Sequence, residues 1–149
     1  MKDRFVAAAA ATAVLVIGGA AGCSSNQASP KPKPGTLPPG TAALTINGKD
    51  LGLTDSVQCA PDEWLTMIRT DHEASGVTVM VSNPKQLAAE FVRIRNLNGF
   101  TGSYDRNLQG KAAVTMKGAT YAITGTAMGF NSAKPSELTT ETFAIKVSC

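Results

Sequence analysis

The chain has 149 residues, of which 43% are hydrophobic and only 5% aromatic, and its formal net charge at pH 7 is +3. This length suits one ordinary domain and argues against a second independent hydrophobic core. The positive charge is mild and scattered, so nothing in the sequence favours a nucleic acid as a partner.

The first 22 residues have the three-part pattern of an export signal. Lys2 and Arg4 provide a positively charged start, an apolar stretch covers residues 5–17, and small residues follow up to Gly22. A membrane-spanning helix needs about 20 strongly apolar residues, so this stretch is too short for one. We predict that residues 1–22 are a lipoprotein signal peptide that is removed after export.

Cys23 directly follows these small residues, as in a bacterial lipobox, although Ala20 stands where lipoboxes usually carry leucine. In such a signal the cysteine thiol receives diacylglycerol and the new amino terminus can be acylated. We predict lipidation of Cys23, with no other cofactor, and a location at the outer face of the cell membrane. Two or three acyl chains, at about 0.8 kcal/mol per buried methylene, would hold the protein there. The alternative is cleavage nearby, with an unmodified thiol at Cys23.

Residues 23–42 contain repeated proline and almost nothing apolar to bury. Such a composition favours an extended polyproline II tether. Lys31 and Lys33 are expected to be solvated, and the serine and threonine hydroxyls of this stretch are candidate O-glycosylation acceptors. We predict that residues 23–42 form a disordered tether and residues 43–149 a β domain.

From Ala43 onward, short runs of alternating polar and apolar residues are separated by turn signals such as Asn47-Gly48 and Asn98-Gly99. These patterns are typical of strands joined by tight hairpins. Gly125 and Gly129 interrupt one long run and suggest β-bulges there. The expected strands are residues 44–46, 51–53, 56–59, 64–70, 77–81, 90–97, 100–104, 112–116, 120–130 and 140–149.

Residues 83–88 are ambiguous, because Asn83 and Pro84 resemble the start of a helix. We expect at most one helical turn over residues 85–88, with a longer helix as the alternative. Residues 71–76 are expected to form a polar hairpin loop. The predicted fold is mainly β, a one-domain antiparallel β-sandwich or partial barrel, and a parallel α/β fold is excluded because no helices alternate with the strands.

If Cys23 is lipidated, Cys59 and Cys149 remain as an even pair in an exported protein, where disulfides persist. We predict that they form a disulfide bond that closes the domain. Two free thiols or a metal pair are the alternative, but the chain has one histidine and no Cys-x-x-Cys motif, so zinc ligation is poorly supplied.

No motif indicates an enzyme. His72 lies between Asp71 and Glu73 without a nucleophile in a recognisable motif beside it, and the acidic pair Asp62-Glu63 is best interpreted as a loop surface. The aromatic side chains either fill the core or, if the sandwich opens, line an apolar cavity. Those considered are Trp64, Phe91, Phe100, Tyr104, Tyr121, Phe130 and Phe143.

Several segments together resemble the LpqH-type mycobacterial lipoprotein antigens, the 19 kDa lipoprotein family. They are CSSN at residues 23–26, INGKD at 46–50, VQC at 57–59, NLNG at 96–99, YAITGTAMG at 121–129 and FAIKVSC at 143–149. The resemblance implies a lipid-anchored envelope antigen, with Cys23 as the lipid attachment point and a Cys59–Cys149 disulfide. The tether departs from that family's Thr, Ser and Ala-rich linker, which can be mannosylated.

The resemblance also implies that innate receptors for bacterial lipopeptides recognise the acylated amino terminus. We therefore expect a non-enzymatic surface lipoprotein, a module that interacts with envelope or host components. A carrier that binds a lipid or glycolipid in an apolar cavity of the β domain is the second hypothesis. A cavity open to solvent would favour the carrier, and a filled core would favour the interaction module.

Overall fold

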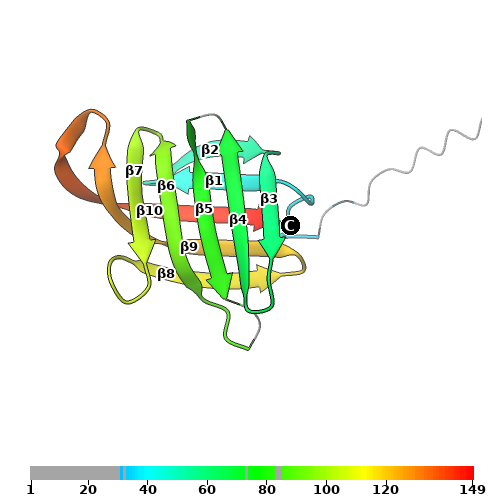
Figure 1. Cartoon of the computed structure of the whole chain (residues 1–149). Helices are drawn as coiled ribbons and strands as arrows, with labels where there is room; N and C mark the ends of the chain where they lie inside the picture. Colours follow the sequence, from blue (N-terminus) through cyan, green and yellow to red (C-terminus); the bar gives the residue numbers. More distant parts are fainter. Residues whose placement is uncertain (1–30, 32, 73, 83–84) are drawn as a thin grey trace, which may run out of the picture. The chain divides into compact units, whose positions relative to one another are not determined.

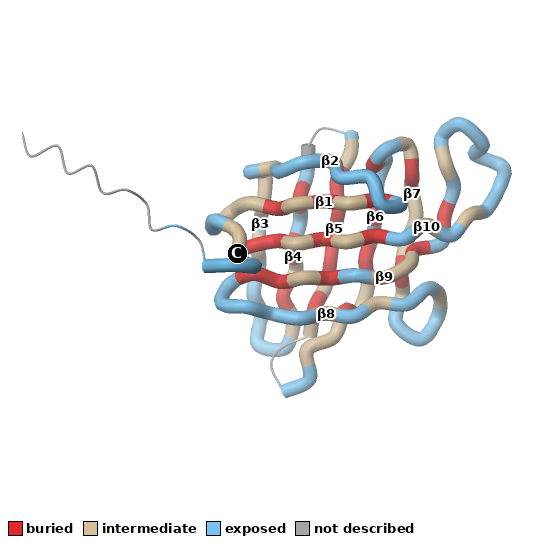
Figure 2. The backbone as a smooth tube through the Cα atoms, turned by 180° about the vertical axis from the view of Figure 1, so that it is seen from behind, coloured by how far each residue is buried: buried red, intermediate tan, exposed pale blue. Residues whose placement is uncertain are grey.

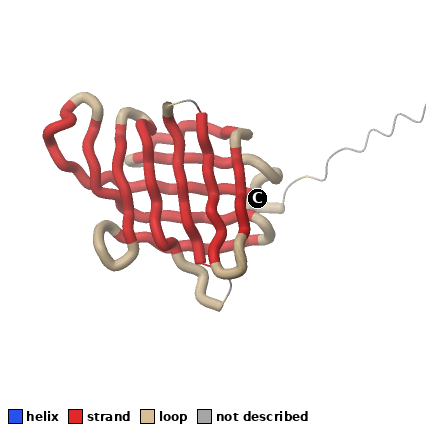
Figure 3. The backbone as a smooth tube through the Cα atoms, in the orientation of Figure 1, coloured by secondary structure: helices blue, strands red, loops and turns tan. Residues whose placement is uncertain are grey.

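The computed structural model describes residues 31, 33–72, 74–82 and 85–149, with His72 described through its backbone alone. Within this part of the chain the regular elements are all strands, and none of the described residues forms a helix (Figure 3). The predicted signal peptide and Cys23 lie outside the described residues. The predicted mainly β, antiparallel fold is confirmed.

The strands follow one another in the compact unit that comprises Lys31–Cys149. They are β1 (Ala42–Ile46), β2 (Lys49–Thr54), β3 (Val57–Pro61), β4 (Leu65–His72), β5 (Ser75–Ser82), β6 (Ala89–Leu97), β7 (Phe100–Asp105), β8 (Lys111–Lys117), β9 (Thr120–Asn131) and β10 (Lys134–Ser148).

The strands pair in the order β2-β1-β10-β9-β7-β6-β5-β4-β3, and β8 also pairs with β9. Figure 1 shows β3 to β7 crossing in front of β1, β2, β8, β9 and β10 at a steep angle, which is the arrangement of an orthogonally packed sandwich. β9 connects the two layers, because residues 120–126 pair with β8 and residues 128–131 pair with β7.

Tight turns fix the register of the hairpins. Asn47 and Gly48 both have positive φ, of 49° and 78°, and Asn98 and Gly99 have φ of 49° and 79°. Two consecutive positive φ values define the turn whose twist matches that of antiparallel strands, and Asn-Gly adopts it at little cost. The two turns predicted at these dipeptides are confirmed.

The core lies between the two layers and follows the period of two (Figure 2). On β1 the side chains of Ala42, Leu44 and Ile46 are buried, and on β10 those of Phe143, Ile145 and Val147 are buried. Phe100, Tyr104 and Tyr121 join this core. Trp64 is 67% exposed and Phe130 38% exposed, so the aromatic residues are divided between the core and the surface.

The two glycines of β9 do not form bulges. The register of β9 is continuous through Gly125 and Gly129 against each of its partners. A Cβ atom at Gly125 would overlap the Lys111 carbonyl oxygen, and one at Gly129 would overlap that of Thr101. Glycine is therefore needed here for close approach of the neighbouring backbone, and the bulge prediction was wrong.

Two connections also differ from expectation. The described residues 85–88 form no helical turn; instead, the Ser82 amide donates to the Ala88 carbonyl at 2.9 Å and the Ala88 amide donates to Ser82 Oγ at 3.1 Å. The expected loop at residues 71–76 is largely strand, because Asp71 pairs with Gly76 and His72 with Ser75. In both places, pairing between β5 and its neighbours overrides the local sequence signal.

A disulfide joins Cys59 on β3 to Cys149, immediately after β10, with the two Cα atoms 5.9 Å apart. β3 is an edge strand whose backbone neighbour in the sheet is β4. The bridge therefore links a free edge of one layer to the end of a central strand of the other.

The later half of the expected tether contacts the β domain. Leu37 N–H donates to Thr120 Oγ1 at 3.1 Å, and Lys117 Nζ donates to the Pro34 carbonyl at 2.6 Å. Gly40 N–H donates to the Ser148 carbonyl at 2.9 Å. Residues 34–41 are thus held against the ends of β9 and β10, and the first strand begins at Ala42.

Candidate functional site

On strand β4, two threonines lie on the buried face and two large apolar side chains lie on the outer face. Thr66, Ile68 and Thr70 are buried, whereas Leu65 and Met67 are only partly buried on the opposite face, which they share with exposed Arg69. Alternate residues of a strand point to opposite faces of the sheet. Buried polar residues opposite partly exposed apolar ones are the informative departure from ordinary burial, and they mark the outer face of β4 as a candidate functional surface.

The inward threonines are compatible with a well-packed core. Val77 N–H donates to Thr70 Oγ1 at 3.2 Å. Within the described part of the chain, no buried side-chain nitrogen or oxygen atom lacks a hydrogen-bond partner. The core therefore tolerates the polar face of β4, and Leu65 and Met67 remain on the outside.

Cross-strand pairing extends this face into two parallel rows. One row is apolar, because Met67 on β4 lies opposite Met80 on β5, which lies opposite Phe91 on β6. The adjacent row is polar, with Gln58 opposite Arg69, Arg69 opposite Thr78, and Thr78 opposite Arg93. The outer face of β3 to β6 is therefore amphipathic, with the polar row and the apolar row two residues apart along each strand.

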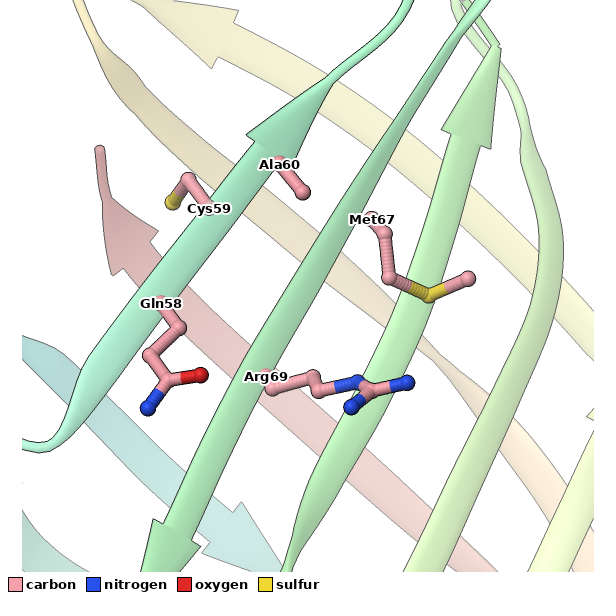
Figure 4. Close-up of a pocket in the computed structure, with 5 residues that line it drawn as sticks. All are labelled: Gln58, Cys59, Ala60, Met67 and Arg69. Carbon is pink, nitrogen blue, oxygen red and sulfur yellow. The ribbon is translucent and has the colours of Figure 1, made fainter.

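A shallow depression of about 350 Å³ lies at the β3 end of these rows. Its lining residues are Gln58, Cys59, Ala60, Met67 and Arg69 (Figure 4). In Figure 4 the Gln58 amide extends toward Arg69, while the side chains of Met67 and Arg69 lean the same way across the sheet. The depression thus combines a guanidinium group, an amide and a thioether on one open surface.

The charges on this face are almost fully paired. Arg93 contacts Asp105 at 2.7 Å and Arg95 contacts Asp71 at 2.9 Å. The Arg93 guanidinium also lies 4.8 Å from the centre of the Phe91 ring. Arg69 has neither an ion pair nor a hydrogen bond to any described residue, so it is the cation left available on the outer face of β3 to β7.

Two other depressions lie outside the core. One, of about 310 Å³, is on β1, β10 and β9, where alanine and threonine side chains and Leu37 contribute to its lining. The other, of about 210 Å³, lies beside the β9–β10 hairpin and includes Lys134, Glu137 and Leu138. The buried side chains of the core, Phe100 and Ile145 among them, occupy the space between the layers.

The acidic residues singled out in the sequence do not meet a catalytic partner among the described residues. Asp62 and Glu63 are exposed in the β3–β4 turn, where Asp62 Oδ1 accepts the Glu63 amide at 2.7 Å. His72 belongs to β4 through its backbone pairing with Ser75. The described residues contain no cluster of three or more histidine, cysteine or acidic side chains that could hold a metal ion.

Arg69, Met67 and Met80 were not among the site residues predicted from the sequence. The alternation over residues 64–70 predicts a strand, but hydropathy alone would place the Met67 side chain on the buried face of that strand. A usable signal exists in the sequence, because the β-branched residues Thr66, Ile68 and Thr70 share one face and the charged Arg69 lies on the other. No helix in the described residues is long and apolar enough to cross a membrane.

Comparison with known proteins gives consistent matches along the chain. Residues 35–149 match the family described as Mycobacterium 19 kDa lipoprotein antigen. A putative lipoprotein of Mycobacterium avium subsp. hominissuis is 37% identical over 97% of this chain and 92% of its own length. A putative lipoprotein of Mycobacterium indicus pranii is 36% identical over the full length of both chains. The lipoprotein LpqH of Mycobacterium tuberculosis H37Rv is 32% identical over 100% of this chain and 99% of its own length.

Proposed function

Because the chain belongs to the Mycobacterium 19 kDa lipoprotein antigen family, we propose that it is anchored by a lipid on Cys23 and displays its β domain at the outer face of the cell membrane. Cys23 follows a signal-like segment and precedes a proline-rich stretch, so an acylated cysteine there would leave the whole domain outside the membrane. The match over residues 35–149 carries the proposal, because it places this domain among lipoproteins.

The β domain acts as an interaction module and not as an enzyme or a carrier. Its core is filled by its own side chains, including Phe100, Ile123 and Ile145, each no more than 2% exposed. The depressions described above are open and shallow, whereas ligand-carrying β proteins enclose most of their ligand. The surface, with its amphipathic outer face on β3 to β6, supplies the contacts with envelope or host components.

The acylated amino terminus is the second contact surface. A diacylated or triacylated cysteine followed by a polar peptide is the feature by which innate receptors for lipopeptides would recognise the protein. The proline-rich stretch separates this terminus from the folded domain, so the two surfaces can be engaged independently.

The anchor is tested by expressing the wild-type chain and Cys23→Ser in a mycobacterial host and measuring detergent-phase partitioning and intact mass. The wild type should enter the detergent phase with a mass that corresponds to residues 23–149 plus two or three acyl chains. Cys23→Ser should remain aqueous. A wild-type protein that begins at another residue, or that carries an unmodified thiol at Cys23, would contradict the proposal.

A further inference from the structure

Among the described residues of the outer face of β3 to β7, Arg69 is the cation without an ion pair. This face carries three arginines and two aspartates. Arg93 pairs with Asp105 and Arg95 pairs with Asp71, so Arg69 has no ion pair. Glu90, at the irregular start of β6, is paired with Arg106 at 2.7 Å. A guanidinium group offers several donors in a planar fork that matches a phosphate or carboxylate group. Gln58, the residue opposite Arg69 on β3, carries an amide that can add a further donor.

Apolar side chains lie directly next to this cation. Met67 is two residues before Arg69 on the same face of β4, and Met80 and Phe91 continue the apolar row across β5 and β6. All three are partly exposed. Methionine side chains are flexible and polarisable, and they are frequent on surfaces that accept apolar groups of variable shape. The arrangement suits a ligand with an acidic head and an apolar tail.

The site lies at the end of the domain from which the chain leads to Cys23. Gln58 precedes Cys59, which is bonded to Cys149, and the neighbouring Ser148 carbonyl accepts a hydrogen bond from Gly40. Only residues 24–33 separate Cys23 from Pro34, the first described tether residue that is bonded to the domain. At about 3.1 Å per residue in polyproline II form, these residues reach at most roughly 31 Å. If Cys23 is in the membrane, phospholipid headgroups are within reach of this end.

We propose that the outer face of β3, β4 and β5 binds phospholipids of the anchoring membrane, with the lipid phosphate at Arg69 and Gln58 and the apolar part over Met67 and Met80. The inference rests on the proposed anchor for the nearness of the membrane, but not for the chemistry of the site. The acidic turn of Asp62 and Glu63 does not oppose it strongly. Arg69 is four residues from the start of β4, roughly 13 Å along the strand, which exceeds the Debye length of about 8 Å at physiological ionic strength.

The test uses the mature chain, residues 23–149, with Cys23→Ser, so that binding by the domain is measured without the anchor. The probe is vesicles of phosphatidylcholine with and without phosphatidylglycerol, and the partition coefficient is measured by sedimentation. The vesicles with phosphatidylglycerol should bind more protein. Arg69→Gln should lower that binding about fivefold, which corresponds to about 1 kcal/mol for one cation at an anionic surface.

Two matched controls lie on β8, in the other layer. Lys111→Gln removes an exposed cation and Met116→Ser an exposed methionine, and neither should change the partition coefficient. Met80→Ser should reduce binding to the vesicles with phosphatidylglycerol. Because Arg69 is exposed and has no described partner, Arg69→Gln should fold normally, which its thermal unfolding midpoint will verify.

Three results would overturn the inference. Equal losses for Arg69→Gln and Lys111→Gln would mean that only net charge matters, and equal binding to both vesicle types would mean that no phosphate site exists. A dimer in sedimentation equilibrium that Met80→Ser abolishes would assign the face to a second copy of the chain. Failure of the anchor itself appears separately, in the intact mass of the wild-type protein, and leaves these vesicle measurements interpretable.

Discussion

Removing the Cys59–Cys149 disulfide should cost the domain a large part of its stability. The bridge joins positions 90 residues apart, and the loop-closure model assigns about 4 to 5 kcal/mol at 25 °C to a loop of this length. The double variant Cys59→Ser, Cys149→Ser also leaves β3 held by its pairing with β4 at the edge of the sheet. Domains of this size have total unfolding free energies of about 5 to 15 kcal/mol, so losing the bridge would remove about a third or more of the domain's stability.

Urea unfolding followed by far-UV circular dichroism measures the effect. With a slope of about 2 kcal/mol per M, the midpoint should fall by about 2 M. A reducing agent should lower the wild-type midpoint by a similar amount and leave that of the double variant unchanged. Cys23→Ser is the control, because it removes a sulfur atom outside the described domain and should not move the midpoint. A double variant within about 1 kcal/mol of the wild type would refute the argument from loop closure.

Two further predictions concern β9. Gly125→Ala should lower the free energy of unfolding by about 1 to 3 kcal/mol, because the new Cβ atom would meet the Lys111 carbonyl of β8 and force the strands apart; an unchanged thermal midpoint would show that β8 yields freely. Thr120→Val should speed amide hydrogen exchange at Leu37, whose N–H loses its acceptor, while exchange at Ile123 in the core stays slow. Equal exchange at Leu37 in both proteins would show that this tether contact is not formed in solution.

The features of the fold that the sequence predicts correctly are those that depend on local residue preferences. Asn47-Gly48 and Asn98-Gly99 specify their turns within two residues, because few other dipeptides accept two positive φ values. The period-two pattern of residues 143–147 likewise identifies both the strand and its buried face. Each of these signals depends on the residue's own backbone or on its immediate neighbours, so a single sequence is enough to read them.

The unpredicted part depends on contacts between distant segments. Gly125 is required by the Lys111 backbone of another strand, and nothing near Gly125 in the sequence indicates that approach. The helix signal at Asn83-Pro84 gives way because Ser82 and Ala88 bond to each other across the connection from β5 to β6. Neither the order of strands nor the partner of a glycine follows from periodicity.

The same limit applies to the candidate site. Its residues come from three strands, and Met67, Met80 and Gln58 acquire a common environment only once β3, β4 and β5 are in register. No local feature of the sequence distinguishes Arg69 from the other arginines. It becomes distinctive because the ion pairs of Arg93 and Arg95 satisfy the acids on its face.

The contacts of residues 34–41 also determine how an anchor at Cys23 would act on the domain. β10 runs from Lys134 at the β9–β10 hairpin to Ser148, where the Gly40 amide is bound. Its 15 residues span up to roughly 46 Å at about 3.3 Å per residue, although the strand is bent. Tension from the membrane would therefore be applied at the Ser148 end, beside the disulfide. The opposite hairpin, with Phe130 and Leu138 exposed, lies at the other end of β10 from this point of attachment.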